Sequence, residues 1–211
     1  MYGRKRPLQS KGGVCPLSNN AKGLSEISAP SVQVEDRRVR KTVNAIHTAF
    51  SKLFFEHGLG GFSVSDLIAA ADIARSTFYK HYSSKEDVLC ALMAPMLRPI
   101  ALCAWSEEAP VPLVQISQHL WENRRKGIPI FEEPAKSALT RQLADLIESQ
   151  RPPDAETPSR LVSMFLSRSA LGMLEEWQSG RHRCSPDAFA GTMHRGLLGA
   201  SRAMNSATPQ G

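Results

Sequence analysis

Cysteine is scarce in this 211-residue chain, and its four cysteines are scattered at positions 15, 90, 103 and 184. They form no CxxC pair, so they fit neither a zinc ribbon nor a disulfide framework. Long apolar runs are absent too, because no stretch approaches the roughly 18 uninterrupted apolar residues of a membrane helix. The basic N-terminus lacks the apolar segment of a secretory signal. These absences predict a cytoplasmic protein without metal sites, disulfides or membrane spans.

The common catalytic motifs are missing as well. The chain contains no GxSxG, P-loop, GxGxxG or HExxH sequence. The acidic residues in the central part of the chain form no defensible catalytic pair. His182 and Cys184 are residue types that can ligate a metal ion, but their spacing matches no standard metal site. We therefore expect no enzyme activity and no cofactor.

Charge is unevenly distributed along a chain of otherwise ordinary composition, with 42% hydrophobic and 22% charged residues. The net charge is +6, and residues 1–34 hold five Lys and Arg against one Glu. This segment is rich in Gly, Ser and Pro and has no apolar periodicity, which predicts a disordered arm. A basic arm fits a polyanion such as nucleic acid, but it fits a solubilising tail equally well.

The remainder has helical periodicity and no strand alternation. We predict about nine helices, with a first helix from about Glu35 to His57, stopped by Gly58. Prolines at 95, 99, 110 and 112 are expected to kink or end the fourth helix. Ser185 and Pro186 are typical of a helix start. The predicted domains are a basic arm (1–34), a first helical domain (35–95), a second helical domain (96–205) and a tail (206–211).

The segment 63–82 has the pattern of a helix-turn-helix. Ser63 can cap a short helix, with Asp66 in its first turn. A turn at 71–73 leads to a second short helix from about Ala74 to Tyr82. Two short helices joined by a tight turn and pressed on a longer helix describe a helix-turn-helix.

The second of these helices mixes aromatic and cationic residues. Phe78 and Tyr82 are four residues apart, so they share one face and can pack on the first helix. The opposite face then carries hydrogen-bond donors for phosphate oxygens and for base edges in a major groove. Its members are Arg75, Ser76, Thr77, Lys80 and His81.

Over residues 38–92 the sequence resembles the TetR/AcrR family of bacterial one-component transcriptional regulators. The matching residues are Ala49, Phe50, Gly58, Phe62, Ser63, Val64, Ala70, Ala71, Ile73, Ser76, Thr77, Phe78, Tyr79, Tyr82, Ser84, Lys85 and Glu86. One departure is Asp72, where the family usually has Gly. Asp enters the left-handed region more readily than most residues, so we expect Asp72 to form this turn.

The resemblance implies an all-α regulator with a helix-turn-helix domain followed by a ligand-binding and dimerisation domain. It implies DNA contacts from Ser63 and Ser65. It further implies base and phosphate contacts from Arg75, Ser76 and Lys80, and phosphate contacts from Thr77, Tyr79, His81 and Lys85. The expected partners are double-stranded DNA with a near-palindromic operator and a second copy of the chain.

The C-terminal part resembles the last two helices of such regulators, which pair with their copies in a homodimer. The predicted interface residues are Phe165, Phe189, Met193 and Leu197, although an intrachain core would show the same pattern. Trp105, Trp121, Phe131 and Trp177 are candidates for an effector pocket, although aromatic residues at helical spacing more often belong to the core. The resulting hypothesis is a repressor released from DNA by a small-molecule effector. The alternative is an effector-independent DNA-binding protein, controlled by a protein partner or acting architecturally.

Overall fold

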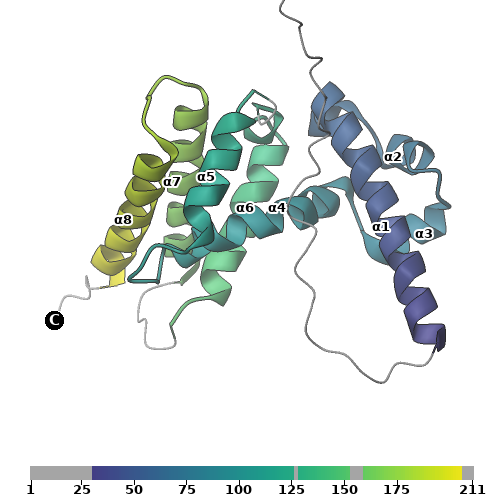
Figure 1. The fold of residues 1–211 in the computed structure, drawn as a ribbon, viewed down its shortest axis with the longest axis horizontal. Helices are drawn as coiled ribbons and strands as arrows, with labels where there is room; N and C mark the ends of the chain where they lie inside the picture. Colours follow the sequence, from purple (N-terminus) through teal and green to yellow (C-terminus); the bar gives the residue numbers. More distant parts are fainter. Residues whose placement is uncertain (1–29, 126–127, 153–158, 206–211) are drawn as a thin grey trace, which may run out of the picture. The chain divides into compact units, whose positions relative to one another are not determined.

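The computed structural model describes residues 30–125, 128–152 and 159–205 (Figure 1). In these ranges all regular structure is helical, with eight α-helices and two short 3-10 helices. The elements are α1 (Pro30–His57), η2 (Leu59–Gly61), α2 (Val64–Ala70), α3 (Arg75–His81), α4 (Lys85–Leu102), α5 (Pro112–Glu122), η3 (Ile128–Phe131), α6 (Ala135–Ser149), α7 (Ser159–Gln178) and α8 (Pro186–Asn205). The all-α prediction is confirmed, and eight α-helices replace the expected nine.

The first helix is longer than predicted. It begins at Pro30 rather than near Glu35, so residues 30–34 of the proposed arm are helical. The rest of the arm, residues 1–29, lies outside the described residues, as does the tail at 206–211. At the other end the predicted stop is confirmed: Gly58 has a φ of 66°, and its N–H donates to the Phe54 carbonyl at 2.9 Å. Only glycine adopts this left-handed conformation without strain.

Aromatic residues form the centre of the N-terminal core. Phe50 and Phe54 of α1 are buried, and their rings stack with centroids 5.5 Å apart. Phe62 meets Phe50 edge to face at 5.7 Å. Phe78 of α3 is completely buried, so α3 is held against the domain through this side chain.

The fourth helix does not end where its prolines suggested. It continues through Pro95 and Pro99 to Leu102, and therefore crosses the predicted domain boundary at residue 95 without interruption. Each proline lacks the N–H that would bond one turn back. The thiol of buried Cys103 donates to the carbonyl of Pro99 at 3.3 Å, and burial raises the pKa of that thiol to about 12. Pro112 stands at the start of α5, where a missing N–H costs nothing.

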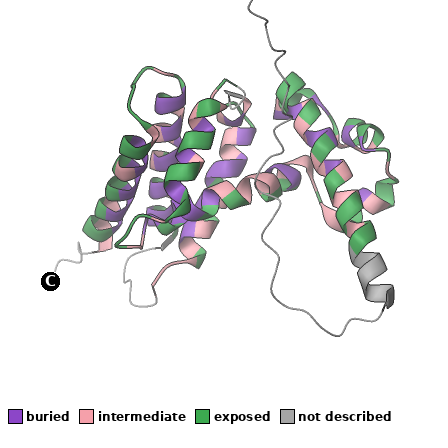
Figure 2. Cartoon of the chain, viewed as in Figure 1, coloured by how far each residue is buried: buried purple, intermediate pink, exposed green. Residues whose placement is uncertain are grey.

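The C-terminal helices bury a continuous apolar core, and Figure 2 shows the buried residues on the sides where these helices face one another. Helix α6 packs against both α4 and α7, and α8 packs against α5 and α7. Gly180 ends α7 with a φ of 76°. The Ser185 hydroxyl accepts from the Ala188 N–H at 3.2 Å, which confirms the predicted start of α8. No helix in the described ranges is long and apolar enough to span a bilayer.

Candidate nucleic-acid interface and ligand pocket

The start of α2 is fixed by a reciprocal cap. The Ser63 hydroxyl accepts from the Asp66 N–H at 3.2 Å, and the Asp66 carboxylate accepts from the Ser63 N–H at 2.8 Å. The backbone bond from Ser63 lowers the pKa of the Asp66 carboxyl, with help from the Ser63 hydroxyl. The Ser63 hydroxyl is thus already engaged with Asp66, whereas Ser65 stands exposed on the first turn of the helix.

The turn between α2 and α3 is made by an unusual residue. Asp72 has a φ of 51°, in the left-handed region that the sequence predicted for it. The turn is closed by the Ile73 N–H, which donates to the Ile68 carbonyl at 3.4 Å. Aspartate tolerates this region better than most residues, so the tight turn forms without glycine.

Two contacts hold the inner face of α3 and the residue after it. The first is the buried ring of Phe78, whose centroid lies 6.2 Å from that of Tyr82. The second is a hydrogen bond of 2.7 Å between the Tyr82 hydroxyl and Nε2 of His47 on α1. Partial burial lowers the pKa of His47 and raises that of Tyr82. The predicted packing of Tyr82 on the first helix is confirmed, and Phe78 is buried as predicted.

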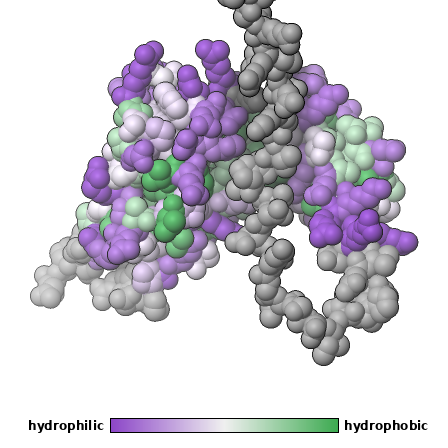
Figure 3. All heavy atoms as spheres, viewed as in Figure 1, coloured by the Kyte–Doolittle hydropathy of each residue, from purple (hydrophilic) through white to green (hydrophobic). Residues whose placement is uncertain are grey.

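The outer face of α3 is polar and free of negative charge. No acidic residue occurs between Ile73 and Ser84. Arg75, Ser76, Tyr79 and Lys80 are exposed, and Thr77 and His81 are partly exposed. The Arg75 guanidinium lies 5.4 Å from the centre of the Tyr79 ring, which limits the directions that both side chains can take. Figure 3 shows hydrophilic side chains gathered over α1 and α3.

Lys85, a predicted phosphate ligand, already has a partner. Its ammonium donates to the Phe62 carbonyl at 2.5 Å and lies 5.1 Å from the centre of the Phe62 ring. This bond ties the start of α4 to the segment before α2. An ammonium has three N–H groups, so two stay available for a phosphate. Ser84 caps α4 in a second reciprocal box with Asp87.

Helix α1 carries a basic surface that was not predicted from the sequence. Arg38, Arg40, Lys41 and Lys52 are all exposed there. Lys41 and Lys52, with Asn44 and Thr48, line a groove of about 580 Å³ whose other wall is the end of α2. The run RRVRK at 37–41 could have predicted this surface from the sequence. The acidic Glu35 and Asp36 beside it lower the net charge of the segment, so the run did not stand out.

His47 predicts a pH dependence of stability. Its pKa in the folded chain lies below the ordinary 6.5, so near that pH the unfolded chain binds more protons. We expect its contribution to be complete above pH 6.5 and to be lost as the pH falls from 6.5 through the lowered pKa. Urea denaturation followed by circular dichroism across this window measures the loss. His47→Gln should flatten the dependence, and parallel curves for wild type and His47→Gln would refute the assignment.

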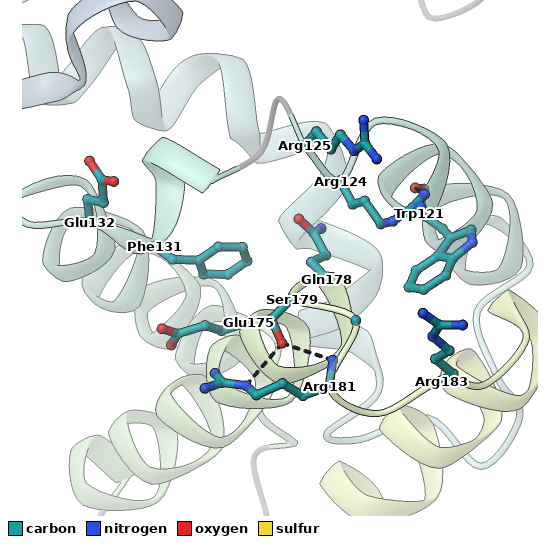
Figure 4. Close-up of a pocket in the computed structure, with 11 residues that line it drawn as sticks. Trp121, Arg124, Arg125, Phe131, Glu132, Glu175, Gln178, Ser179, Arg181 and Arg183 are labelled. Carbon is teal, nitrogen blue, oxygen red and sulfur yellow. Dashed lines mark hydrogen bonds between the residues drawn. The ribbon is translucent and has the colours of Figure 1, made fainter.

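A pocket of about 790 Å³ lies among the C-terminal helices (Figure 4). Two of the four residues predicted to line an effector pocket, Trp121 and Phe131, line it. Trp177 lies behind the wall, stacked on Trp121 with centroids 5.0 Å apart, and its indole N–H donates to the Cys184 carbonyl. Trp105 is absent from the lining, and its N–H donates to the Ile147 carbonyl at 2.9 Å.

The residues predicted for a dimer interface separate into two groups. Phe165 on α7 is 47% exposed and available to a partner. Phe189, Met193 and Leu197 on α8 are instead buried within the chain, each at most 5% exposed. The Phe189 ring stacks on Trp177 at 3.9 Å, so the apolar stripe of α8 faces its own domain. This corrects the sequence-based interface, because such side chains have no surface left for a second copy.

The region around His182 and Cys184 is exposed. No group of three potential metal ligands occurs in the described part of the chain.

Comparison with known proteins matches the geometry of the N-terminal domain. Residues 46–92 match the family described as bacterial regulatory proteins, tetR family. The uncharacterized HTH-type transcriptional regulator YxbF of Bacillus subtilis (strain 168) is 40% identical over 55 residues, covering 26% of this chain and 14% of that protein. The HTH-type transcriptional repressor DhaR of Mycobacterium sp. (strain GP1) is 34% identical over 73 residues, covering 33% and 36%. The chain thus spans well under half the length of either curated relative.

The fold has a relative that extends over most of the chain. A TetR transcriptional regulator from Streptococcus agalactiae 2603V aligns with a TM-score of 0.51 and 24% identity, over 79% of this chain and 98% of that one. At this identity the likeness shows a shared fold. The family match, by contrast, covers the elements α2, α3 and their anchors on α1 and α4. The likeness to the tetR family of bacterial regulatory proteins therefore rests on residues 46–92, and beyond them the comparison shows a shared fold.

Proposed function

We propose that the protein is a DNA-binding transcriptional regulator that places α3 in the major groove of its operator. The observation that carries this proposal is the outer face of α3, which is cationic and polar and has no acidic residue. Such a surface offers donors to phosphates and to guanine O6 and N7, and the fixed inner face supplies the rigidity that base reading needs. A regulator of this kind acts on DNA in the cytoplasm and is not an enzyme.

We assign the individual contacts by exposure and charge. Arg75 and Lys80 are the base-reading candidates. Ser76 is a third candidate, because it lies four residues before Lys80 and so shares its face of the helix. The phosphate contacts are assigned to Ser63, Ser65, Thr77, Tyr79, His81 and Lys85. The Ser63 hydroxyl donates its single proton to the Asp66 carboxylate and must turn away from it to bond a phosphate, so Ser65 is the stronger donor at the start of α2.

The experiment that tests the proposal is selection of bound fragments from a random pool of duplex DNA by the purified chain. The proposal expects a near-palindromic consensus, with half-sites about 34–36 Å apart or a multiple of that distance. Recovery of fragments without any shared sequence would point to architectural binding instead. Failure to retain DNA at all at low salt would overturn the proposal.

The proposed dimer uses the exposed sides of the last two helices. Leu161 and Phe165 on α7 are 75% and 47% exposed, which is unusual for such large apolar side chains. Gly172 on α7, with Gly196 and Gly199 on α8, has nothing within 4 Å of the position where a Cβ would stand, so the backbone there is open to close approach. We propose that these residues replace the buried stripe of α8 as the homodimer interface.

This interface predicts a change of oligomeric state without loss of fold. Leu161→Asp combined with Phe165→Asp should give monomers at micromolar concentration in light scattering, since charges in an apolar interface are strongly unfavourable. The helical content should stay unchanged, because both side chains are exposed. The matched control is Val111→Asp, an 87% exposed valine at the start of α5, which should leave the dimer intact. A persistent dimer in the double variant would exclude this interface.

Repression released by a ligand is the proposed mode of action. The matched Mycobacterium protein is named a repressor, and the aligned 73 residues favour the same mode here. The pocket of about 790 Å³ lies within the 300–1,000 Å³ range of small-molecule sites, which favours a ligand-responsive regulator over an effector-independent one. The proposed mechanism is a change in separation between the two α3 helices of a dimer when a ligand fills this pocket.

A further inference from the structure

The pocket carries an excess of positive charge at its wall. Four arginines line it, at positions 124, 125, 181 and 183, against two glutamates. Glu175 is neutralised by the Lys136 ammonium at 2.6 Å, and Arg181 by Glu176 at 2.8 Å. Within the described ranges, Arg125 and Arg183 make no ion pair with a carboxylate. An occupant with a negative charge would therefore be favoured over a neutral or cationic one.

Gln178, the last residue of α7, is a second and independent indication that the pocket binds a ligand. It forms part of the pocket wall, yet it is only 7% exposed and neither its amide nitrogen nor its amide oxygen has a hydrogen-bond partner. Figure 4 shows the side chain directed between Phe131 and Arg124. Buried amides are almost always paired, because an unpaired one loses its bonds to water without replacement. A group in the pocket that accepts from the amide N–H would remove this deficit after a small rotation of the side chain.

The remaining walls are aromatic and rigid. The ring of Trp121 stacks on that of Trp177, which in turn stacks on that of Phe189. This series of three stacked rings fixes the position of Trp121. Arg124 lies 4.4 Å from the centre of the Trp121 ring and donates to the Trp121 carbonyl at 2.9 Å. Phe131, from η3, supplies a second ring that points into the pocket. These surfaces suit a flat apolar body, with its charged group directed to the arginines.

We propose that this pocket binds a small aromatic carboxylate, held by the Gln178 amide and the Arg183 guanidinium and packed against Trp121 and Phe131. The inference rests on the proposed function, since it names the ligand class of the effector site. Arginine matches a carboxylate with parallel N–H bonds, and an amide N–H adds a third donor. The flat shape of such a ligand uses ring surface that a small inorganic anion would leave empty.

Binding is tested without DNA, by calorimetric titration of the full chain with benzoate, 2-naphthoate and indole-3-acetate. Each carboxylate is paired with its neutral carboxamide, which has the same ring and nearly the same shape. At least one carboxylate is expected to bind and to exceed its carboxamide by about tenfold or more, the usual range of a charge-assisted hydrogen bond. Equal affinity within every pair, or no binding of any carboxylate at about 1 mM, would overturn the proposal.

Three variants locate the site. Gln178→Leu keeps the approximate volume and removes the amide, so it should weaken the carboxylate about tenfold while the melting temperature stays level or rises. Arg183→Gln, in the exposed loop before α8, should weaken it by a similar factor without affecting the fold. The control Arg168→Gln changes an exposed arginine of α7 that does not line this pocket, and should leave affinity unchanged. Wild-type affinity in both pocket variants would refute the site.

Failure of this inference and failure of the proposed function give different results. If the carboxylates do not bind but the chain still selects operator DNA, only the ligand class is wrong. If carboxylates bind as expected but the chain retains no DNA, the pocket stands and the regulator assignment falls.

Discussion

Replacing Arg75 and Lys80 together with alanine is expected to abolish the preference of the protein for its operator. Each side chain contributes about 1–3 kcal/mol to discrimination if it bonds a base edge. The two lie five residues apart on α3 and share no partner in the structure, so their effects should add to about 2–6 kcal/mol. Fluorescence anisotropy at fixed salt measures this, with the selected operator compared against a scrambled duplex.

The controls separate base reading from charge. Thr77→Ala should weaken the operator and the scrambled duplex alike, because a phosphate contact carries no sequence information. Arg168→Ala removes one positive charge from α7 and should alter neither affinity. If the double variant still preferred its operator by the wild-type ratio, α3 would not be the element that reads bases.

Lys85 is expected to affect stability as well as DNA binding. As a phosphate contact carries no sequence information, Lys85→Ala should weaken the binding of all DNA sequences equally. It also removes the bond to the Phe62 carbonyl, so a lower melting temperature is expected beside the weaker binding. A phosphate role for Lys85 therefore requires that binding be compared at a temperature where both proteins are folded.

Local chemistry made much of the N-terminal domain predictable. The cap at Ser63, the stop at Gly58 and the left-handed turn at Asp72 each depend on one or two residues and their immediate neighbours. Residue type alone then restricts the backbone to few conformations. The inner position of Phe78 followed from spacing, since residues four apart share a helical face.

Long-range pairing was not predictable in the same way. The stripe of Phe189, Met193 and Leu197 identifies an apolar face but not what covers it, and Trp177 of the same chain covers it here. The indole N–H of Trp105 finds its acceptor 42 residues away, at Ile147. Periodicity contains no information on such partners, so core, pocket and interface looked alike in sequence.

Gln178 shows the same limit for a polar residue. Nothing in its sequence context distinguishes it from other glutamines on helices. Only the packing of α7 and its neighbours reveals that both amide atoms are covered and unpaired. A candidate ligand contact of this kind becomes visible only in three dimensions.

Phe78→Ala is expected to have the largest effect on the stability of the N-terminal domain. The side chain is fully buried, and truncation of such a phenylalanine costs about 3–5 kcal/mol through lost burial and the cavity left behind. Helix α3 has only seven residues, too few to stay helical without its anchor. Hydrogen exchange should therefore show lost protection across α2 and α3, and operator binding should disappear with it.

The neighbouring residue supplies the matched control for this prediction. Tyr79 is 46% exposed and lies on the outer face of the same helix, so Tyr79→Ala should change stability by about 0.5 kcal/mol or less. It should still weaken DNA binding, because its hydroxyl is one of the proposed phosphate contacts. These two adjacent aromatic residues would then separate the stability of α3 from its contact with DNA, since Phe78 holds the helix in place and Tyr79 contacts a phosphate. Full protection of α3 in Phe78→Ala, with operator affinity unchanged, would mean that the helix is held by the bond between His47 and Tyr82 instead.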